Sequence, residues 1–245
     1  MSTRFALRAQ MEEIMDDLDC SGEVVRQTLK ELGLINKWLG GNAVSLDGIT
    51  RLLAKWGKPD KPLALADLGC GGGEMLIEIA RWGKKNNIAM SLTGIDANPH
   101  IVAMAQAQAR AAGYPQIRFV QQNVSSKEFQ NTRFDIITAS LFTHHFSSSE
   151  LAGLFRSLCR QARIGMVIND LHRHWLAYYS IKWLTTLFSR SAMVRFDAPV
   201  SVLRAFSRSD WTDILGQAGI ARYTLTWKWA FRWQLIISTG QKGTV

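Results

Sequence analysis

The stretch from Ala66 to Glu74, Ala-Asp-Leu-Gly-Cys-Gly-Gly-Gly-Glu, constrains the fold of this chain most strongly. It follows an apolar run over residues 62–66 and precedes a helical pattern over residues 73–84. This order predicts a strand, a glycine-rich turn and a helix, with which α/β domains bring backbone against a nucleotide-like ligand. Glycine suits the turn because it adopts positive φ freely and has no Cβ to hold a ligand away.

The charges beside this turn discriminate between ligands. A phosphate-binding loop has Lys and then Ser or Thr after its last glycine, whereas Glu74 and Met75 follow here, which argues against a nucleoside triphosphatase. In the dinucleotide pattern G-x-G-x-x-G, Glu74 takes the third glycine position, where its carboxylate repels a pyrophosphate. Since Asp67 adds a second acid, the turn suits a ligand with a cationic part.

The segment from Asp67 to Gly73 resembles the first motif of class I S-adenosylmethionine-dependent methyltransferases, an acidic residue followed by x-G-x-G-x-G. The resemblance covers about residues 60–240 and extends loosely to the ubiquinone and menaquinone biosynthesis methyltransferases. It implies S-adenosyl-L-methionine as cofactor and S-adenosyl-L-homocysteine as product. The methionine part of the cofactor, with its ammonium and sulfonium, is then expected on the turn.

Later strand ends extend this resemblance. Asp96 ends the next predicted strand, where a carboxylate accepts hydrogen bonds from both ribose hydroxyls. Residues 117–122 predict a third strand, and the resemblance places the adenine edge beside the residues that follow it. The residues expected to bind the cofactor are Asp67, Gly69, Cys70, Gly71, Asp96, Ala97, Asn123, Val124 and Ser140.

Alternating apolar and amphipathic segments predict the fold class. The expected strands are 62–66, 91–96, 117–122, 134–140 and 165–170, followed by a hairpin over 221–228 and 231–238. The expected helices between them are 73–84, 98–112, 126–130, 147–160 and 211–218. We therefore predict an α/β fold with a doubly wound, Rossmann-like, seven-stranded, mostly parallel sheet and a C-terminal antiparallel hairpin.

Two segments lie outside this alternation. Residues 1–60 predict an N-terminal helical cap with helices over 5–18, 24–39 and 46–56, and residues 61–245 the Rossmann-like methyltransferase domain. Within that domain, an insertion over residues 171–206 predicts a helical lid. Its first helix is apolar on nearly all sides but too short to span a bilayer. Packing on the cap, a homodimer and peripheral contact with anionic lipid all remain open for this helix.

Four of the five histidines fall in the loops after the fourth and fifth strands: His144, His145, His172 and His174. Ligands of open α/β sheets lie beyond the carboxyl ends of the strands, and imidazole is the usual general base near neutral pH. We hypothesise that His145 deprotonates a phenol, enol or acidic carbon, and that His172 or Asp170 orients the acceptor. His144 completes the candidate catalytic set. The alternative is that His144 and His145 only pack or cap the next helix.

Other chemistries fit the residues less well. Adjacent histidines point in different directions on most backbones, and no suitably spaced carboxylate triad accompanies them, so no metal is expected. A Ser-His-Asp hydrolase is disfavoured because no G-x-S-x-G turn occurs. The three cysteines are few and widely spaced, which favours a reducing compartment over a disulfide framework.

The charge is unevenly distributed. Residues 1–150 hold 16 Lys and Arg and 16 Asp and Glu, whereas residues 151–245 hold 13 and 4, a net charge of +9. A basic face binds nucleic acid, an anionic membrane or an acidic substrate, or is simply solvated. With no apolar run of 18 residues and no signal-peptide core near the N-terminus, we expect a cytoplasmic protein, with peripheral membrane contact left open.

The leading interpretation is a methyltransferase that acts on oxygen or carbon of an apolar or aromatic small molecule, such as a phenol, polyketide, quinone or lipid-like compound. A nucleic-acid or protein methyltransferase is the first alternative. The N-P-P-Y motif of amide methylation is absent after the fourth strand, where residues 139–142 read Ala-Ser-Leu-Phe, so nucleic acid is not favoured. An NAD-type oxidoreductase or a non-catalytic binding protein is the second alternative.

Overall fold

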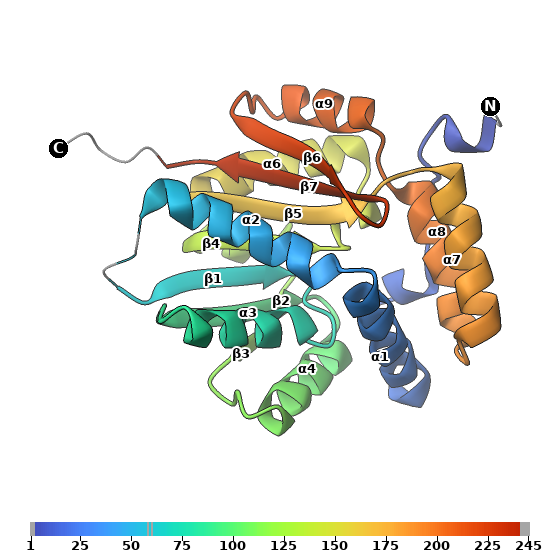
Figure 1. Cartoon of the computed structure of the whole chain (residues 1–245), viewed down its shortest axis with the longest axis horizontal. Helices are drawn as coiled ribbons and strands as arrows, with labels where there is room; N and C mark the ends of the chain where they lie inside the picture. The colour runs from blue at the N-terminus through green and yellow to red at the C-terminus, as the bar shows by residue number, and fades with distance from the viewer. Residues whose placement is uncertain (1–2, 58, 60, 241–245) are drawn as a thin grey trace.

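The computed structural model describes residues 3–57, 59 and 61–240. Its centre is a seven-stranded sheet with the order β3-β2-β1-β4-β5-β7-β6 (Figure 1). The strands are β1 Leu63–Leu68, β2 Met90–Asp96, β3 Arg118–Gln121, β4 Phe134–Ser140, β5 Ala162–Leu171, β6 Tyr223–Lys228 and β7 Arg232–Ser238. Strands β1 to β5 pair in parallel, and β7 is antiparallel to both β5 and β6. The predicted sheet with its C-terminal hairpin is therefore confirmed.

Helices cover both faces of the sheet (Figure 1). One face carries α2 (Gly41–Trp56), α3 (Glu74–Lys85) and α4 (Pro99–Ala111), and the other carries α5 (Lys127–Gln130), α6 (Ser148–Gln161) and α9 (Arg208–Gln217). Strand side chains point alternately to the two faces, so each face has its own apolar core. Ile49 and Leu76 lie in one core, and Phe155 and Trp211 in the other.

Local capping signals set the helix starts that the sequence predicted. The Asn98 side chain accepts from two backbone N–H groups of α4, whose first residue is proline. Ser147 and Glu150 form a reciprocal capping box at the start of α6. These groups satisfy N–H donors that have no partner within the helix, so α4 and α6 begin where the sequence predicted, whereas α2 begins five residues before the predicted position 46 and α9 three residues before the predicted position 211.

The predicted helix over residues 5–18 is wrong. The segment is extended apart from short 3-10 turns, η1 (Thr3–Phe5) and η2 (Ile14–Asp16). Its backbone bonds elsewhere: Ala9 N–H donates to the carbonyl of Leu203, and the N–H groups of Ile14 and Met15 donate to the carboxylate of Asp197. Tertiary hydrogen bonds thus replace the helical ones that the apolar spacing predicted.

Three further helices gather at the end of the sheet to which the parallel strands point (Figure 1). They are α1 (Gly22–Trp38), α7 (Trp175–Phe188) and α8 (Ala192–Arg204). Helix α2, which also precedes the first strand, packs directly on β5 instead. The approach is so close that a Cβ on Gly48 would come within 2.4 Å of Val167, so only glycine fits there. The predicted division between cap and domain falls at residue 60, which lies outside the described residues.

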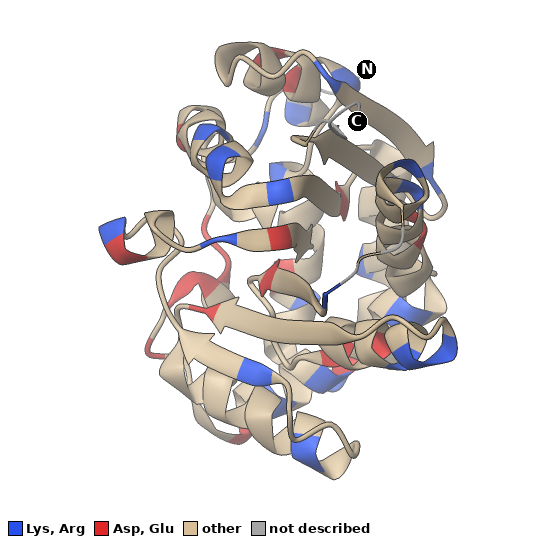
Figure 2. Ribbon diagram, turned by 90° about the vertical axis from the view of Figure 1, so that its left-hand side faces the viewer, with Lys and Arg blue, Asp and Glu red and all other residues tan. Residues whose placement is uncertain are grey.

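Basic residues do not form one continuous face. Figure 2 shows Lys and Arg spread over helices on both sides of the sheet, interspersed with Asp and Glu. Three arginines of the basic C-terminal part, Arg173, Arg204 and Arg232, are buried. Within the described part of the chain, no helix has the length and apolarity needed to cross a membrane.

Candidate active site

The glycine turn after β1 is tightly enclosed. Gly69, Gly71 and Gly73 all have positive φ, at 62°, 50° and 82°. A Cβ built on Gly69 would lie 2.1 Å from the ring of Phe142, whereas one on Gly71 would meet only Leu29, at 3.6 Å. Glycine at position 69 is therefore required both by its backbone conformation and by the ring beside it.

Two carboxylates border this turn without a cationic partner. Asp67 is buried and accepts a hydrogen bond from Thr138 Oγ1 at 2.7 Å, while Asp96 Oδ2 accepts from the N–H of Gly71 at 3.2 Å. Burial, together with the charges of Asp96 and Glu74, raises the pKa of Asp67 to about 7. No ion pair to these three acids occurs among the described residues, so the turn is an electronegative site that a cationic ligand would neutralise.

The other predicted cofactor residues line the neighbouring strand ends. Cys70 and Val124 are buried, Ala97 is half-buried, and Asn123 is exposed. The Oδ1 atom of Asn123 accepts from the N–H of Ser125 at 2.8 Å. All of these residues lie at the carboxyl edge of β1, β2 and β3, as the sequence predicted, and their contacts with a cofactor remain predictions.

A strained turn carries the first histidine pair. After Ser140 ends β4, Leu141 adopts a left-handed conformation with φ 54°, and η3 (Thr143–His145) follows. The N–H of Leu141 donates to the carbonyl of Asn169 in β5 at 2.9 Å. Non-glycine residues adopt positive φ at an energetic cost, and such strain clusters at functional sites. The turn directs His144 and His145 towards the N-terminal segment.

His144 is enclosed between two carboxylates. Its Nδ1 lies 2.7 Å from Asp170 Oδ1 and its Nε2 lies 3.4 Å from Glu13 Oε1, with all three side chains buried. Burial lowers the pKa of His144, but Asp170 and Glu13 outweigh it and raise that pKa to about 10. An imidazole that is already protonated at neutral pH does not accept another proton, so the geometry favours a positioning role for His144.

Asp170 is also committed to internal contacts. Besides His144, it accepts hydrogen bonds from Thr143 Oγ1 at 2.5 Å and from the N–H of Leu171 at 2.7 Å. Although burial opposes it, the charge of His144 holds the pKa of Asp170 well below its usual range. Because Asp170 has no exposed surface, the geometry opposes the expected direct contact with an acceptor and leaves Asp170 to anchor the histidine turn.

His145 differs from its neighbour because it keeps an accessible edge. Its Nδ1 lies 2.5 Å from Asp16 Oδ1, and its side chain is 26% exposed. The other oxygen of Asp16 binds Arg204, which also donates to the carbonyl of His145 at 2.8 Å. With Nδ1–H held by Asp16, the tautomer that remains presents Nε2 as a proton acceptor.

Phe142 connects this histidine to the glycine turn. Its ring centroid lies 6.3 Å from that of His145, and the same ring packs beside Gly69. The charge of His145 also opposes the rise in the pKa of Asp96 that burial causes. His145 is therefore close to both predicted parts of the cofactor site.

Sequence reasoning missed the residues that hold the histidine turn from outside. Arg8 donates to the carbonyl oxygens of His144 and Phe146, at 3.1 and 2.8 Å, and Asp16 orients His145. These residues belong to the segment for which the sequence predicted a helix. Its run of acids was visible in the sequence, but nothing local indicated which strand end it would contact.

His172 belongs to a different cluster. Trp227 Nε1 donates to its Nδ1 at 3.2 Å, and the ring of Trp233 lies 5.0 Å away. Burial and the charges of His174 and Arg173 lower the pKa of His172 to about 4, so this imidazole is neutral at pH 7. The two histidine loops therefore contact different surroundings, and a role for His172 in orienting the acceptor remains a prediction.

One cluster has the composition of a cation site. Glu13, His144 and His145 each offer one ligand atom within 4.8 Å of the others. This set could hold a divalent cation, whereas the spacing of the histidines and carboxylates in the sequence predicted no metal. His144 and His145 would then be metal ligands rather than proton acceptors. A chelator would abolish activity in the first case and not in the second, so an experiment can separate the two roles.

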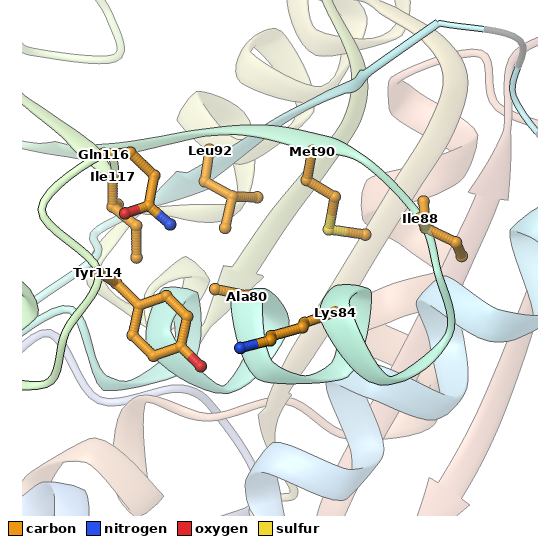
Figure 3. A pocket seen from close by; sticks show the side chains of 8 residues that line it. All are labelled: Ala80, Lys84, Ile88, Met90, Leu92, Tyr114, Gln116 and Ile117. Atoms are coloured by element: carbon orange, nitrogen blue, oxygen red, sulfur yellow. The ribbon is translucent and has the colours of Figure 1, made fainter.

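A separate cavity of about 250 Å³ lies at the opposite edge of the sheet (Figure 3). It is lined from the end of α3 by Lys84, from the start of β2 by Met90, and before β3 by Tyr114. Since ligands of such sheets bind beyond the carboxyl ends of the strands, this cavity is not the predicted cofactor site.

The comparisons with known proteins agree with this geometry. A family model described as a methyltransferase domain matches residues 65–165. A ubiquinone biosynthesis O-methyltransferase of Methylobacterium sp. (strain 4-46) is 27% identical over 183 residues, covering 71% of this chain and 69% of the relative. The chain is therefore a methyltransferase, and its matched domain lies over residues 65–165.

Solved structures share the fold of this methyltransferase. The plantazolicin methyltransferase, solved with S-adenosylhomocysteine, superposes with a TM-score of 0.63 at 15% identity, covering 89% of this chain and all of that one. The magnesium protoporphyrin IX methyltransferase of Synechocystis PCC 6803, solved with S-adenosylmethionine, gives 0.54 at 17% identity, covering 93% and 89%.

The residues of the turn fit the cofactor of the family. The space over Gly71 is free of close contacts, and the unpaired carboxylates of Asp67 and Asp96 suit an ammonium, a sulfonium and a ribose. The methyltransferase therefore uses S-adenosylmethionine as its cofactor.

Proposed function

We propose that this methyltransferase methylates an oxygen or carbon of an apolar or aromatic small molecule, with His145 as the general base. The observation that carries the proposal is the contact between His145 and Asp16 beside the glycine turn. A carboxylate on Nδ1 fixes the tautomer and stabilises the imidazolium that forms when Nε2 accepts a proton. His144 holds a proton between two acids, which makes it the weaker candidate.

The chain's own residues carry out the steps around the transfer. Asp67, Asp96 and the turn at Gly69 would hold S-adenosylmethionine, which supplies an electrophilic methyl group on a positively charged sulfur that leaves as a neutral thioether. Asp16 orients His145, and His145 Nε2 takes the proton from the hydroxyl or acidic carbon of the acceptor. The deprotonated acceptor is the nucleophile. We expect general-base catalysis of this kind to contribute about 10²- to 10⁴-fold to the rate.

We propose oxygen as the first acceptor atom to test. The named relative of Methylobacterium is an O-methyltransferase, and it aligns with more than two thirds of this chain. Phenols also match the base, because an imidazole near neutral pH can assist the ionisation of a phenol more readily than that of an aliphatic alcohol.

We propose that residues 171–206 and the N-terminal segment form a lid over the acceptor. The interior side of the lid is apolar: Tyr178 and Val202 pack with Leu203 in one cluster. Arg204 ties α8 to the carbonyl oxygens of the histidine turn. Such a lid would exclude water from the transfer and favour acceptors with an apolar body.

We propose that the outer face of α7 contacts anionic lipid. Trp183 and Phe188 are 67% and 77% exposed, and Lys182, Arg190 and Arg195 lie close to them in the sequence. Exposed aromatics beside basic residues are typical of interfacial helices. Cosedimentation with phosphatidylglycerol vesicles, but not with phosphatidylcholine vesicles, is expected. If the protein instead dimerises without binding vesicles, this face serves a second copy of the chain.

Two measurements test the proposed function. Calorimetric titration should detect binding of S-adenosylmethionine and S-adenosylhomocysteine but not of NAD. Incubation with S-adenosylmethionine labelled in its methyl group, against phenols, polyketide-like enols and a transfer RNA control, should label a small molecule. If only the RNA is labelled, the small-molecule proposal fails. If neither cofactor binds to folded protein, the cofactor site is wrong.

A further inference from the structure

Arg232, the first residue of β7, is a buried cation without an anionic partner. Its side chain is 2% exposed, and no carboxylate of the described residues lies within ion-pair distance of it. Its guanidinium makes one hydrogen bond to described residues, from Nη1 to Asn169 Oδ1 at 3.5 Å, and its Nε has no partner. Burial lowers the pKa of Arg232 to about 10, so it is still charged at neutral pH.

An unpaired buried guanidinium is unfavourable for the folded protein. Transfer of a charge from water into the interior costs free energy that only a counter-charge or several hydrogen bonds offset. Asp170 is the one carboxylate whose charge raises the pKa of Arg232, and its oxygens already accept from Thr143, His144 and Leu171. Among the described residues, Nε–H of Arg232 is therefore left without an acceptor.

The surroundings of Arg232 have the elements of an anion site. A Cβ on Gly41, in the first turn of α2, would lie 3.0 Å from Arg232 Cζ and 1.9 Å from Asn36 Oδ1. That Asn36 oxygen is itself buried and accepts no hydrogen bond from any described residue. No side chain caps the start of α2, where Gly40 is the N-cap residue. The positive end of the α2 dipole and the guanidinium of Arg232 therefore lie side by side at Gly41, where a larger residue would not fit.

This site and the histidine turn lie on opposite faces of the same strand end. Arg232 pairs in register with Leu171 of β5 and shares its face, whereas the preceding residue, Asp170, points to the other face and holds His144. The start of α2 is fixed to the end of β4 by a 2.8 Å hydrogen bond between Ser45 and Ser140. Asn36 and Gly40 are only half-buried, so Arg232 lies one layer of side chains below the surface.

The cofactor's own carboxylate does not account for this site. The glycine turn belongs to β1, and β4 and β5 lie between β1 and β7. Three strand spacings of about 4.8 Å separate the turn from Arg232 by about 14 Å. A methionine carboxylate seated on the turn is therefore far from the guanidinium, whereas an acceptor beyond the ends of β4 and β5 extends towards it.

We propose that Arg232, together with the amino end of α2, binds a carboxylate of the methyl acceptor. The guanidinium fork matches the two oxygens of a carboxylate, and the N–H groups at the start of the helix are further donors. The acceptor is then an aromatic or long-chain acid whose hydroxyl faces His145 while its carboxylate faces Arg232. This inference rests on the proposed function, because it names the class of acceptor for the same site.

The test compares a charged probe with a neutral probe of the same shape. Protein saturated with S-adenosylhomocysteine is titrated with 4-hydroxybenzoate and with 4-hydroxybenzamide in a calorimeter. We expect the acid to bind at least about tenfold more tightly than the amide, the least that a charge-assisted hydrogen bond contributes. In Arg232→Met this preference should disappear while affinity for S-adenosylhomocysteine stays unchanged. The exposed Arg222→Met is the matched control and should retain the preference.

A second variant keeps the test decisive if Arg232→Met does not fold. Gly41→Ala leaves the charge in place but puts a methyl group between Asn36 and Arg232, and should weaken acid binding more than amide binding. The inference fails if wild type binds both probes equally or neither of them, or if folded Arg232→Met still prefers the acid. Loss of S-adenosylhomocysteine binding by wild type would instead overturn the proposed function.

Discussion

The carboxyl edge of the sheet has two halves, the glycine turn after β1 and the histidine turn after β4. They differ in whether their buried carboxylates are paired with cations. Beside the glycine turn, Asp67 and Asp96 form no ion pair with any described residue, and burial raises the pKa of both. Beside the histidine turn, Asp16 and Asp170 are paired with imidazoles, which hold both carboxyl pKa values below their usual range despite burial. The first half is incomplete without a cationic ligand, whereas the second is neutralised internally and leaves one imidazole edge accessible.

This difference separates ligand binding from catalysis. Unpaired buried carboxylates destabilise the empty protein and so favour any ligand that supplies the missing positive charge. The paired histidine turn needs no ligand to be ordered, which positions His145 before an acceptor arrives. The same reasoning applies to Arg232 with the opposite charge: a buried cation without an ion-pair partner favours an anionic ligand.

His145→Ala should produce the largest change. We expect turnover of an identified acceptor to fall by about 10²- to 10⁴-fold, because a general base is lost. Affinity for S-adenosylhomocysteine should stay within about twofold in calorimetry, since the cofactor half is intact. If EDTA abolishes wild-type turnover and Mg²⁺ or Zn²⁺ restores it, His145 acts as a metal ligand and the base assignment is wrong.

Asp170→Asn should destabilise the fold. It removes one partner of a buried ion pair and weakens the anchoring of the histidine turn, so we expect a loss of about 3–5 kcal/mol in the free energy of unfolding. Urea denaturation at pH 7 measures this loss. The exposed Asp213→Asn should change stability by less than about 0.5 kcal/mol. Equal stability of the two variants would contradict the paired-charge description of this half.

Asp67→Asn should stabilise the cofactor-free protein at alkaline pH. Because the folded pKa is raised to about 7 from an ordinary value of 3.8, stability from this group is fully present below about pH 4 and is lost as pH rises to 7. The variant lacks this loss, so at pH 8 we expect it to be about 2–4 kcal/mol more stable than wild type, and nearly equal at pH 4.

The same variant should bind S-adenosylmethionine more weakly at pH 8, since an amide carries no charge for the ammonium. Parallel denaturation and calorimetry therefore give effects of opposite sign. If Asp67→Asn is less stable than wild type at pH 8, the carboxylate is not an uncompensated charge and the comparison between the two halves fails.

Asp96→Ala should weaken cofactor binding by about 10- to 100-fold, the range expected for charge-assisted hydrogen bonds to a ribose. Titration with S-adenosylhomocysteine measures it, with the exposed Glu128→Gln as control. Unchanged affinity would show that Asp96 only braces the N–H groups of Gly71 and Asn98, which it contacts in this structure.

The sequence by itself determined the sheet and the glycine turn. Strand periodicity, the caps at Asn98 and Ser147, and glycines at positions that demand positive φ are local signals, and each one fixed an element or its start. The cofactor was implied by the resemblance of the same stretch, Asp67 to Gly73, to the first motif of the methyltransferases.

Only the tertiary structure decided what surrounds the histidines. Asp16 lies 129 residues before His145 in the sequence. Its segment has a helical pattern, but hydrogen bonds with Asp197 and Leu203 hold it in a different conformation. The raised pKa of His144 arises from carboxylates brought in by other segments, which outweigh the effect of burial and which no local pattern encodes. In the sequence, Arg232 is likewise an ordinary strand residue. Packing against α2 buries it, and no described carboxylate forms an ion pair with it.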